Sequence, residues 1–273
     1  MPAGHGGFIS EHLHWGWIYL INVPLGVATF GLAALAGLAF ALVETRGAEP
    51  MIDMTLFRSR QFTGGTLTLG LWSFGVFGIY FFSALWLQNV LGFTPTEAGG
   101  AFVPMALVMG TVAVLSQRIG ALLGLGRTVA LGMALMGAAI FMISGVGADG
   151  TYGDVLPWFL LYGLGGGMLV PLNAAVLDGM PAGRSGIGSG VLNVSREVFG
   201  LLGITVLGAV LSARQAASGA APLTAFLEGY QFTLVIAAGV VLAGIPLALY
   251  TLRANRTLPP APEPQAATAG SLN

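Results

Sequence analysis

The stretch GYQFTLVIAAGVVLAGIPLALYTL, residues 229–252, contains no charged side chain from its first residue to its last. A helix needs about 20 predominantly apolar residues to cross the hydrocarbon core of a bilayer. In that core, every backbone polar group must find its hydrogen-bond partner within the protein, which a helix provides. The stretch therefore predicts a transmembrane helix.

The same pattern recurs along the chain. Six further stretches are long and apolar enough to span a membrane: 17–43, 62–87, 98–116, 128–148, 155–177 and 187–211. The last of these contains Arg196 and Glu197, and it is treated separately below. We predict an all-α integral membrane protein, a helical bundle of about seven transmembrane helices.

The composition supports a membrane protein and excludes several functions. Charged residues make up 8% of the chain and apolar residues 55%, with a mean hydropathy of +0.84, whereas soluble domains carry about 25% charged residues. The net charge of −1 offers no basic surface for nucleic acid. The sequence has no cysteine and no lysine, which excludes thiolate chemistry and a Walker A phosphate loop. No catalytic triad or nucleotide fingerprint is present, so we expect neither an enzyme nor a cofactor.

The arginines predict the orientation, because cytoplasmic loops of membrane proteins are enriched in basic residues. With the N-terminus outside and the C-terminus in the cytoplasm, Arg214 alone falls on the outer side. The arginines on the inner side are then Arg46, Arg58, Arg60, Arg118, Arg127, Arg184, Arg253 and Arg256.

The chain divides into four parts by pattern. Residues 1–48 contain the first span, and residues 62–256 contain the other six. Between them, 49–61 alternates apolar with charged residues, as in a short cytoplasmic helix lying in the membrane interface. Residues 257–273 are rich in proline and alanine and are predicted to be disordered.

Three segments resemble one family of transporters. Residues 15–26 (WGWIYLINVPLG) are similar to the sixth-helix entry, and residues 49–62 (EPMIDMTLFRSRQF) to the lead-in of the ninth helix, of the fourteen-helix drug:proton antiporters. Pro171-Leu-Asn173 with residues 183–196 (GRSGIGSGVLNVSR) resembles their connection between helices twelve and thirteen. This family, of the EmrB/QacA type, is a branch of the major facilitator superfamily.

The resemblance implies a fold and a function. Residues 62–256 would be the C-terminal six-helix bundle, and residues 1–48 a remnant of the N-terminal bundle with one helix. The family's first five helices, and the two between its bundles, have no counterpart here. We therefore expect a truncated chain that is not competent alone, which a second copy or a missing N-terminal bundle would complete.

The expected activity is secondary active multidrug efflux in the bacterial inner membrane. The partners would be membrane lipid, protons and hydrophobic or cationic small molecules. The alternative is a non-transporting helical membrane protein that acts as a partner or regulatory subunit. A seven-helix receptor fits the span number, but the chain has no lysine to hold retinal.

Aromatic, methionine and amide side chains are the candidates for substrate binding, because aromatic faces bind apolar and cationic drugs and methionine adapts to varied ligands. The candidates are Trp72, Phe77, Tyr80, Gln88, Met105, Met168, Asn173 and Asn193. Packing against lipid or other helices is the alternative role for each aromatic. Trp72 and Trp86 are spaced as interfacial anchors at opposite ends of a span.

Ionisable residues within spans are costly and are functional candidates by default. Arg196 and Glu197 would lie about 14 Å inside their helix if it starts near Ile187. In that case one lines the cavity and the other pairs with a neighbouring helix, because adjacent residues point about 100° apart. If the helix starts nearer Asn193, both reach back to the cytoplasm. Asp178 is a candidate for proton coupling, or otherwise a carboxylate at the edge of a loop.

Glycine pairs four residues apart permit close helix packing; they are Gly120/Gly124, Gly163/Gly167 and Gly186/Gly190. Prolines within spans predict kinks or broken helices; they are Pro104, Pro157, Pro171 and Pro246. His5, His12 and His14 cluster near the N-terminus without a supporting set of ligands, so we predict no metal site.

Overall fold

The computed structural model describes residues 57–178 and 185–252, together with scattered residues between 31 and 42. The chain forms two compact units, Met1–Met54 and Thr55–Asn273. Most of the predicted first span, most of the linker at 49–61, the histidine cluster and the tail at 257–273 lie outside the described residues.

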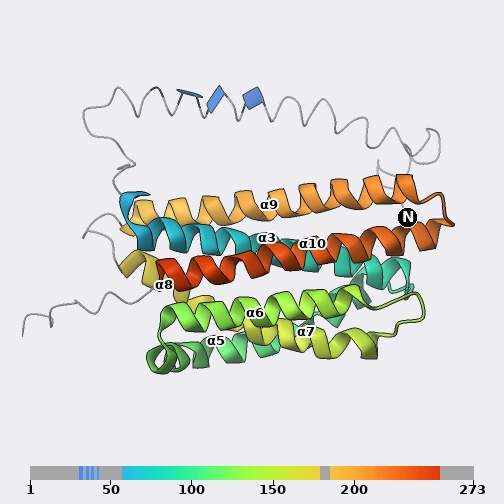
Figure 1. Cartoon of the computed structure of the whole chain (residues 1–273), viewed down its shortest axis with the longest axis horizontal. Helices are drawn as coiled ribbons and strands as arrows, with labels where there is room; N and C mark the ends of the chain where they lie inside the picture. The colour runs from blue at the N-terminus through green and yellow to red at the C-terminus, as the bar shows by residue number, and fades with distance from the viewer. Residues whose placement is uncertain are drawn as a thin grey trace, which may run out of the picture. The chain divides into compact units, whose positions relative to one another are not determined.

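The second unit is a bundle of long helices (Figure 1). It contains α3 (Arg60–Asn89), α4 (Pro95–Ala101), α5 (Val103–Leu123), α6 (Leu125–Ser144), α7 (Tyr152–Gly167), α8 (Val170–Asp178), α9 (Ser185–Ser218) and α10 (Pro222–Thr251). With α4 joined to α5 and α7 to α8, six helical segments are long and apolar enough to cross a membrane. The described residues contain no strand. The predicted all-α membrane fold is confirmed.

The helices extend further than the apolar stretches that predicted them. The span expected at 98–116 continues to Leu123, and the one expected at 187–211 runs from Ser185 to Ser218. Arg118 and Arg127 therefore lie within helices and not in a loop, and Gly124 alone, with φ +84°, connects α5 to α6. Hydropathy detects the membrane-buried part of a helix, whereas the helix continues until a residue such as Gly124 interrupts it.

Two of the described spans are interrupted. One breaks at Phe102, between α4 and α5, and the segment from Tyr152 to Asp178 breaks at Met168 and Leu169, between α7 and α8. Pro171 follows the break and has no N–H to bond the carbonyl of Gly167, as expected for a proline-broken helix. Pro104 lies in the first turn of α5, whereas Pro157 and Pro246 lie inside α7 and α10.

Helices α3 and α9 pack closely through glycine. A Cβ added at Gly200 would lie 2.6 Å from the ring of Phe77, and one at Gly203 would lie 2.7 Å from the carbonyl oxygen of Phe74. Both distances are shorter than any real Cβ contact. The absence of side chains at these positions of α9 therefore brings the aromatic side of α3 against it.

The predicted pair Gly163/Gly167 mediates a second close approach. A Cβ at Gly163 would lie 2.5 Å from the carbonyl oxygen of Met105, so α7 rests on the backbone of α5. The other two pairs behave differently. Nothing lies within 4 Å of a Cβ added at Gly186, Gly190, Gly120 or Gly124. Those two pairs do not bring helices together in the described part of the chain, because they face open space.

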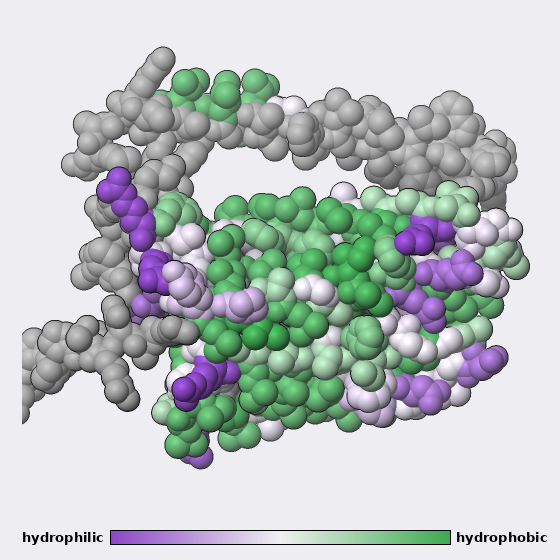
Figure 2. All heavy atoms as spheres, viewed as in Figure 1, coloured by the Kyte–Doolittle hydropathy of each residue, from purple (hydrophilic) through white to green (hydrophobic). Residues whose placement is uncertain are grey.

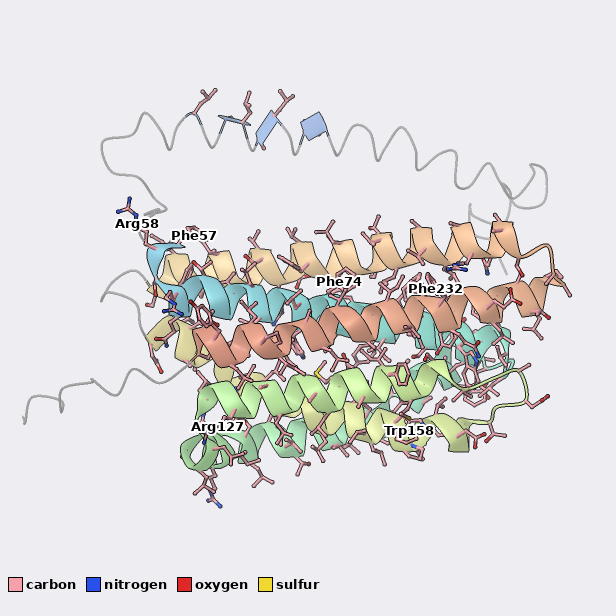
Figure 3. The ribbon with its side chains drawn as sticks, viewed as in Figure 1. Phe57, Arg58, Phe74, Arg127, Trp158 and Phe232 are labelled. Atoms are coloured by element: carbon pink, nitrogen blue, oxygen red, sulfur yellow. The ribbon has the colours of Figure 1, made fainter. Side chains whose placement is uncertain are left out.

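Hydrophilic residues gather at the two ends of the bundle, and the surface between them is largely hydrophobic on the face that Figure 2 shows. Among the described residues, the end that holds the start of α3 carries Arg58, Arg60, Arg118, Arg127 and Asp178. Figure 3 shows Arg58 and Arg127 at this end. The opposite end carries Glu97, Asp149, Asp154, Glu228 and Arg214. One end is thus mainly basic and the other mainly acidic.

Candidate functional site

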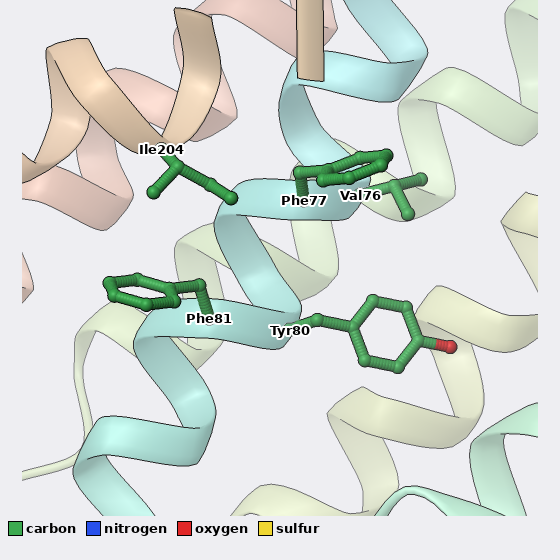
Figure 4. A pocket seen from close by; sticks show the side chains of 5 residues that line it. All are labelled: Val76, Phe77, Tyr80, Phe81 and Ile204. Atoms are coloured by element: carbon green, nitrogen blue, oxygen red, sulfur yellow. The ribbon is translucent and has the colours of Figure 1, made fainter. Parts of the chain in front are cut away.

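An apolar cavity of about 420 Å³ lies between α3 and α9. Its lining residues are Val76, Phe77, Tyr80, Phe81 and Ile204 (Figure 4). The first four come from two successive turns of α3, Val76 and Phe77 from one turn and Tyr80 and Phe81 from the next. They lie on one side of the helix, because residues four apart share a face. Ile204 completes the wall from α9. The hydroxyl of Tyr80 is the one polar side-chain group of this lining.

Packing fixes the aromatic side chains that form the cavity. Phe77 lies against Gly200 of α9, where no other residue leaves room for its ring. Tyr80 packs on Phe102, with ring centroids 5.0 Å apart, and Phe102 packs on Phe159 of α7 at 5.3 Å. The ring of Phe77 is therefore held in place by α9, and the ring of Tyr80 by Phe102.

A second, polar cavity of about 200 Å³ lies between α8 and α9. Its lining residues are Asn173, Leu177, Ser189, Leu192, Asn193 and Arg196. The Ser189 hydroxyl donates to the carbonyl oxygen of Gly186 at 2.8 Å. Three side chains predicted separately from the sequence, those of Asn173, Asn193 and Arg196, thus meet at one cavity.

Arg196 and Glu197 lie well inside α9. The helix starts at Ser185, so the alternative in which it starts near Asn193 is wrong, and Arg196 is about 16 Å along the axis. The Arg196 guanidinium and the Glu197 carboxylate are 3.6 Å apart, with 37% and 48% of the side chains exposed. They face each other, so the expectation that one of them pairs with a neighbouring helix is wrong, whereas Arg196 does line a cavity. Their long side chains span the angle between adjacent positions.

The two cavities lie on one side of α9. Ser189, Asn193, Gly200 and Ile204 follow spacings of four, seven and four residues, which place them on the same face of a helix. Glu197 shares this face, four residues after Asn193. Arg196 and Ile204 are separated by about 12 Å along the axis. The face thus carries a polar cavity, an ion pair and an aromatic cavity in sequence.

The other predicted site residues line neither cavity. Trp72 is half-buried, and its indole N–H has no partner among the described residues. Gln88 donates to the carbonyl of Ala84 in its own helix at 3.1 Å. Met105 and Met168 are buried, Met105 beside Gly163. Asp178 is the exposed last residue of α8, as in its alternative interpretation.

Trp86 departs from its predicted role. It was expected as an interfacial anchor, but it is 1% exposed and lies close to Gly150 in the loop between α6 and α7. The bundle covers this end of α3, so the ring packs within the protein. Spacing along one helix gives no information about which neighbours cover it.

Five of the lining residues were not predicted from the sequence: Val76, Leu177, Ser189, Leu192 and Ile204. Phe81, by contrast, is one of the aromatic side chains of the span predicted at 62–87. Ile204 carried no signal, since only the packing of α9 on α3 brings it to the aromatic residues.

Comparison with known proteins gives the relatives of the chain. The sequence profile of the Major Facilitator Superfamily matches residues 3–204. The tetracenomycin C resistance and export protein of Streptomyces glaucescens is 33% identical over 265 residues, covering 77% of this chain and 49% of the relative. The puromycin resistance protein pur8 of Streptomyces alboniger is 31% identical over 240 residues, covering 82% and 47%.

The multidrug export protein EmrB of Escherichia coli (strain K12) is 25% identical over 259 residues, covering 74% of this chain and 51% of that protein. The chain thus spans about half the length of the curated relatives it matches.

Proposed function

We propose, from the fact that this chain belongs to the Major Facilitator Superfamily, that it forms the C-terminal bundle of a drug exporter. The superfamily consists of transporters, and the chain is related to drug efflux and resistance proteins. It is therefore a membrane transport protein and not an enzyme. Its substrates, its coupling ion and its orientation belong to the proposal.

The aromatic cavity between α3 and α9 is the observation that carries the proposal. Three of its five lining residues are aromatic, and Val76 and Ile204 complete an apolar surface. Ligand sites of this kind bury an apolar body and use few polar groups. Such a cavity accepts hydrophobic molecules of varied shape, as a drug exporter requires. Asn173 and Asn193 add hydrogen-bonding groups at the neighbouring polar cavity.

The Arg196–Glu197 pair is our candidate for coupling to protons. A cation bound at the Glu197 carboxylate would compete both with a proton and with the Arg196 guanidinium. Competition of this kind is what an antiporter needs, because proton and substrate must occupy the site alternately. Glu197 lies on the cavity-lined face of α9 and is about half exposed, so a ligand can reach it. Asp178 is the weaker candidate, since it lies at the exposed end of α8.

The charge distribution supports an orientation for the bundle. Its mainly basic end, which holds Arg58, Arg60, Arg118 and Arg127, would face the cytoplasm, following the enrichment of arginine in cytoplasmic loops. In a bacterium, the membrane that fits this proposal is the inner membrane. The predicted outer N-terminus and cytoplasmic C-terminus agree with this orientation.

Transport by rocking bundles needs a second bundle to enclose the midplane site. Helices α5 and α9 are the least buried of the six spans. We propose that their faces receive that bundle, which either a separate polypeptide segment or a second copy of this chain would supply.

Dye export tests this function. The full chain is expressed in bacteria that lack their own drug exporters, alone and together with the N-terminal portion of the tetracenomycin C exporter. We expect ethidium export that a protonophore abolishes and that Phe77→Ala reduces severalfold. If ethidium is retained equally with and without the chain in both settings, the transport proposal fails and the partner or regulatory role becomes the better reading.

A further inference from the structure

The polar cavity between α8 and α9 holds hydrogen-bond donors that no other residue uses. The side chains of Asn173, Asn193 and Arg196 line it and make no hydrogen bond to any residue that the structure describes. The Ser189 hydroxyl differs, because it donates its one proton to the carbonyl oxygen of Gly186 at 2.8 Å. The donors left for a ligand are therefore one guanidinium and two carboxamide groups.

The Arg196 guanidinium keeps its donors despite the neighbouring carboxylate. Its Nη2 lies 3.6 Å from Oε1 of Glu197, whereas a charge-assisted hydrogen bond between such groups is about 2.7–2.9 Å long. The attraction between the two side chains is therefore electrostatic and uses no N–H group. Since a guanidinium has five N–H donors, it can bind a ligand in the cavity that it lines.

Contacts with α3 hold both walls of this cavity in place. Helix α8 is fixed where the Gln61 side chain donates to the carbonyl oxygen of Ala175 at 2.8 Å. Helix α9 packs tightly on α3, because a Cβ added at Gly70 would lie 2.7 Å from the ring of Phe199, three residues after Arg196. The polar groups of the cavity are thus presented by two helices that a third one joins.

The size and lining of the cavity restrict its ligand. Its volume is about 200 Å³, below the range of about 300–1,000 Å³ that is usual for sites enclosing a drug-sized molecule. It therefore takes a small ligand or one group of a larger one. Leu177 and Leu192 add an apolar wall, and the one charged lining residue is Arg196. A compact anion with an apolar body fits these features.

We propose that the polar cavity binds the carboxylate of an aromatic acid, with both oxygens on the Arg196 guanidinium and the ring against Leu177 and Leu192. The guanidinium fork matches the two oxygens of a planar carboxylate. The amide N–H groups of Asn173 and Asn193 would bind the remaining lone pairs. This inference rests on the proposed function, in which the polar cavity is part of the substrate site, and it names aromatic carboxylates as a substrate class.

The test compares 4-fluorobenzoate, which carries a carboxylate, with 4-fluorobenzamide, a neutral molecule of nearly the same shape. Binding to the full chain in phosphatidylcholine nanodiscs is measured by fluorine NMR at neutral pH, with protein-free nanodiscs as the background. A hydrogen bond to a charged group corresponds to an affinity change of about ten- to hundredfold. We expect 4-fluorobenzoate to bind at least about tenfold more tightly than 4-fluorobenzamide.

Arg196→Gln should abolish this preference, while the affinity for 4-fluorobenzamide changes much less. Arg196→Lys keeps the charge but lacks the paired donors, so it should retain only part of the preference. The matched control is Arg214→Gln, which removes the same charge from an exposed arginine at the mainly acidic end, where its guanidinium lies 3.7 Å from the ring centroid of Phe232. A preference that falls equally in Arg196→Gln and Arg214→Gln would be a general effect of charge and would overturn the proposal.

Glu197→Gln should strengthen 4-fluorobenzoate binding by about two- to fivefold, because Arg196 loses a competing carboxylate. Misfolding does not produce a gain of affinity, so this variant keeps the test decisive even if Arg196→Gln is unstable. An unchanged or reduced affinity in Glu197→Gln would refute the carboxylate site.

The carboxylate site and the transport function are tested separately. If the parent chain shows no preference for 4-fluorobenzoate, the carboxylate site is refuted, and ethidium export still decides the proposed function. If the preference is present and depends on Arg196 but ethidium is not exported, the cavity binds carboxylates and the transport function fails.

Discussion

The hydroxyl of Ser73 donates a hydrogen bond to the backbone carbonyl oxygen of Arg196 at 2.7 Å, joining α3 to α9. Ser73 is buried, and four residues later on the same helix Phe77 lines the aromatic cavity. Four residues after Arg196, Gly200 receives the ring of Phe77. This bond thus joins the two helices at the position of the ion pair, one helical turn before the aromatic cavity. The polar and aromatic parts of the candidate site share one helix contact.

Ser73→Ala should lower the stability of the bundle by about 1 kcal/mol, the usual net value of one buried hydrogen bond. The lost partner leaves the Arg196 carbonyl with its intrahelical bond, so the helix itself persists. Thermal unfolding of the purified chain in detergent measures the change. Ser116→Ala is the control, because the Ser116 hydroxyl bonds Ala113 within α5 and joins no two helices. If both variants lose the same stability, the hydrogen bond between Ser73 and Arg196 contributes no more than a bond within one helix.

Gly200→Ala should reduce the affinity of the aromatic cavity for an apolar aromatic ligand such as fluorene severalfold. The new Cβ would lie 2.6 Å from the Phe77 ring, so the ring must move and the cavity changes shape. The matched control is Gly208→Ala on the same helix, where nothing lies within 4 Å of an added Cβ. Both variants gain the same helix propensity. Unaltered binding in Gly200→Ala would show that Phe77 does not shape the site.

Gly163→Ala should destabilise the bundle by about 1–3 kcal/mol, the usual cost of overpacking a well-packed contact. The added methyl would meet the carbonyl oxygen of Met105 at 2.5 Å, and backbone cannot move aside as a side chain can. Gly190→Ala meets nothing within 4 Å and should leave stability unchanged or improve it, since alanine favours helix. Chemical unfolding in mixed detergent micelles compares the two. A destabilised Gly190→Ala would place an unseen partner on that face of α9.

These contrasts show what the sequence could and could not reveal. Long charge-free stretches predicted five of the six described spans, because the cost of placing charge in a bilayer dominates the pattern, and the sixth was predicted despite Arg196 and Glu197. The broken helix at Met168 was expected from Pro171, since proline has no N–H to donate. Which glycine pairs bring helices together was not readable, because Gly163/Gly167 and Gly186/Gly190 have the same spacing and differ only in their neighbours.

Only part of the candidate site was predicted, again because the sequence does not show which neighbours a residue has. Asn173, Asn193 and Arg196 were identified by their polarity inside spans, and Phe77 and Tyr80 by their aromatic rings. Ile204 and the contact between Arg196 and Glu197 were not. Residue chemistry is visible in one sequence, whereas the side of a helix that meets its neighbour depends on how the whole bundle packs.

Glu197→Gln should weaken the binding of the cation ethidium at neutral pH, because the carboxylate that attracts the cation is lost. The binding of an uncharged aromatic such as fluorene should stay unchanged. Arg196→Gln should strengthen ethidium binding at neutral pH, since the carboxylate loses its competing guanidinium. Pairs with this exposure are worth about 0.2–1 kcal/mol, so the gain should not exceed about fivefold. Fluorescence titration with each ligand at neutral pH measures both; an ethidium affinity that is the same in Glu197→Gln as in the parent chain would show that this carboxylate does not bind the cation.

Single cysteines test the orientation, and the chain is suited to them because it has no cysteine of its own. Leu122 is 85% exposed and lies two residues before the turn at Gly124, at the mainly basic end. Gly147 is exposed in the loop that follows α6, at the mainly acidic end, with nothing within 4 Å of an added Cβ.

A membrane-impermeant maleimide added to intact cells should label Gly147→Cys at once and Leu122→Cys only after the membrane is opened. The basic end should stay in the cytoplasm because moving arginine across the bilayer is unfavourable. The parent chain should take up no label, which reports the background. If Leu122→Cys is labelled in intact cells and Gly147→Cys is not, the bundle has the opposite orientation, with the Arg58 end outside. That result would contradict the arginine rule, which predicts the Arg58 end in the cytoplasm.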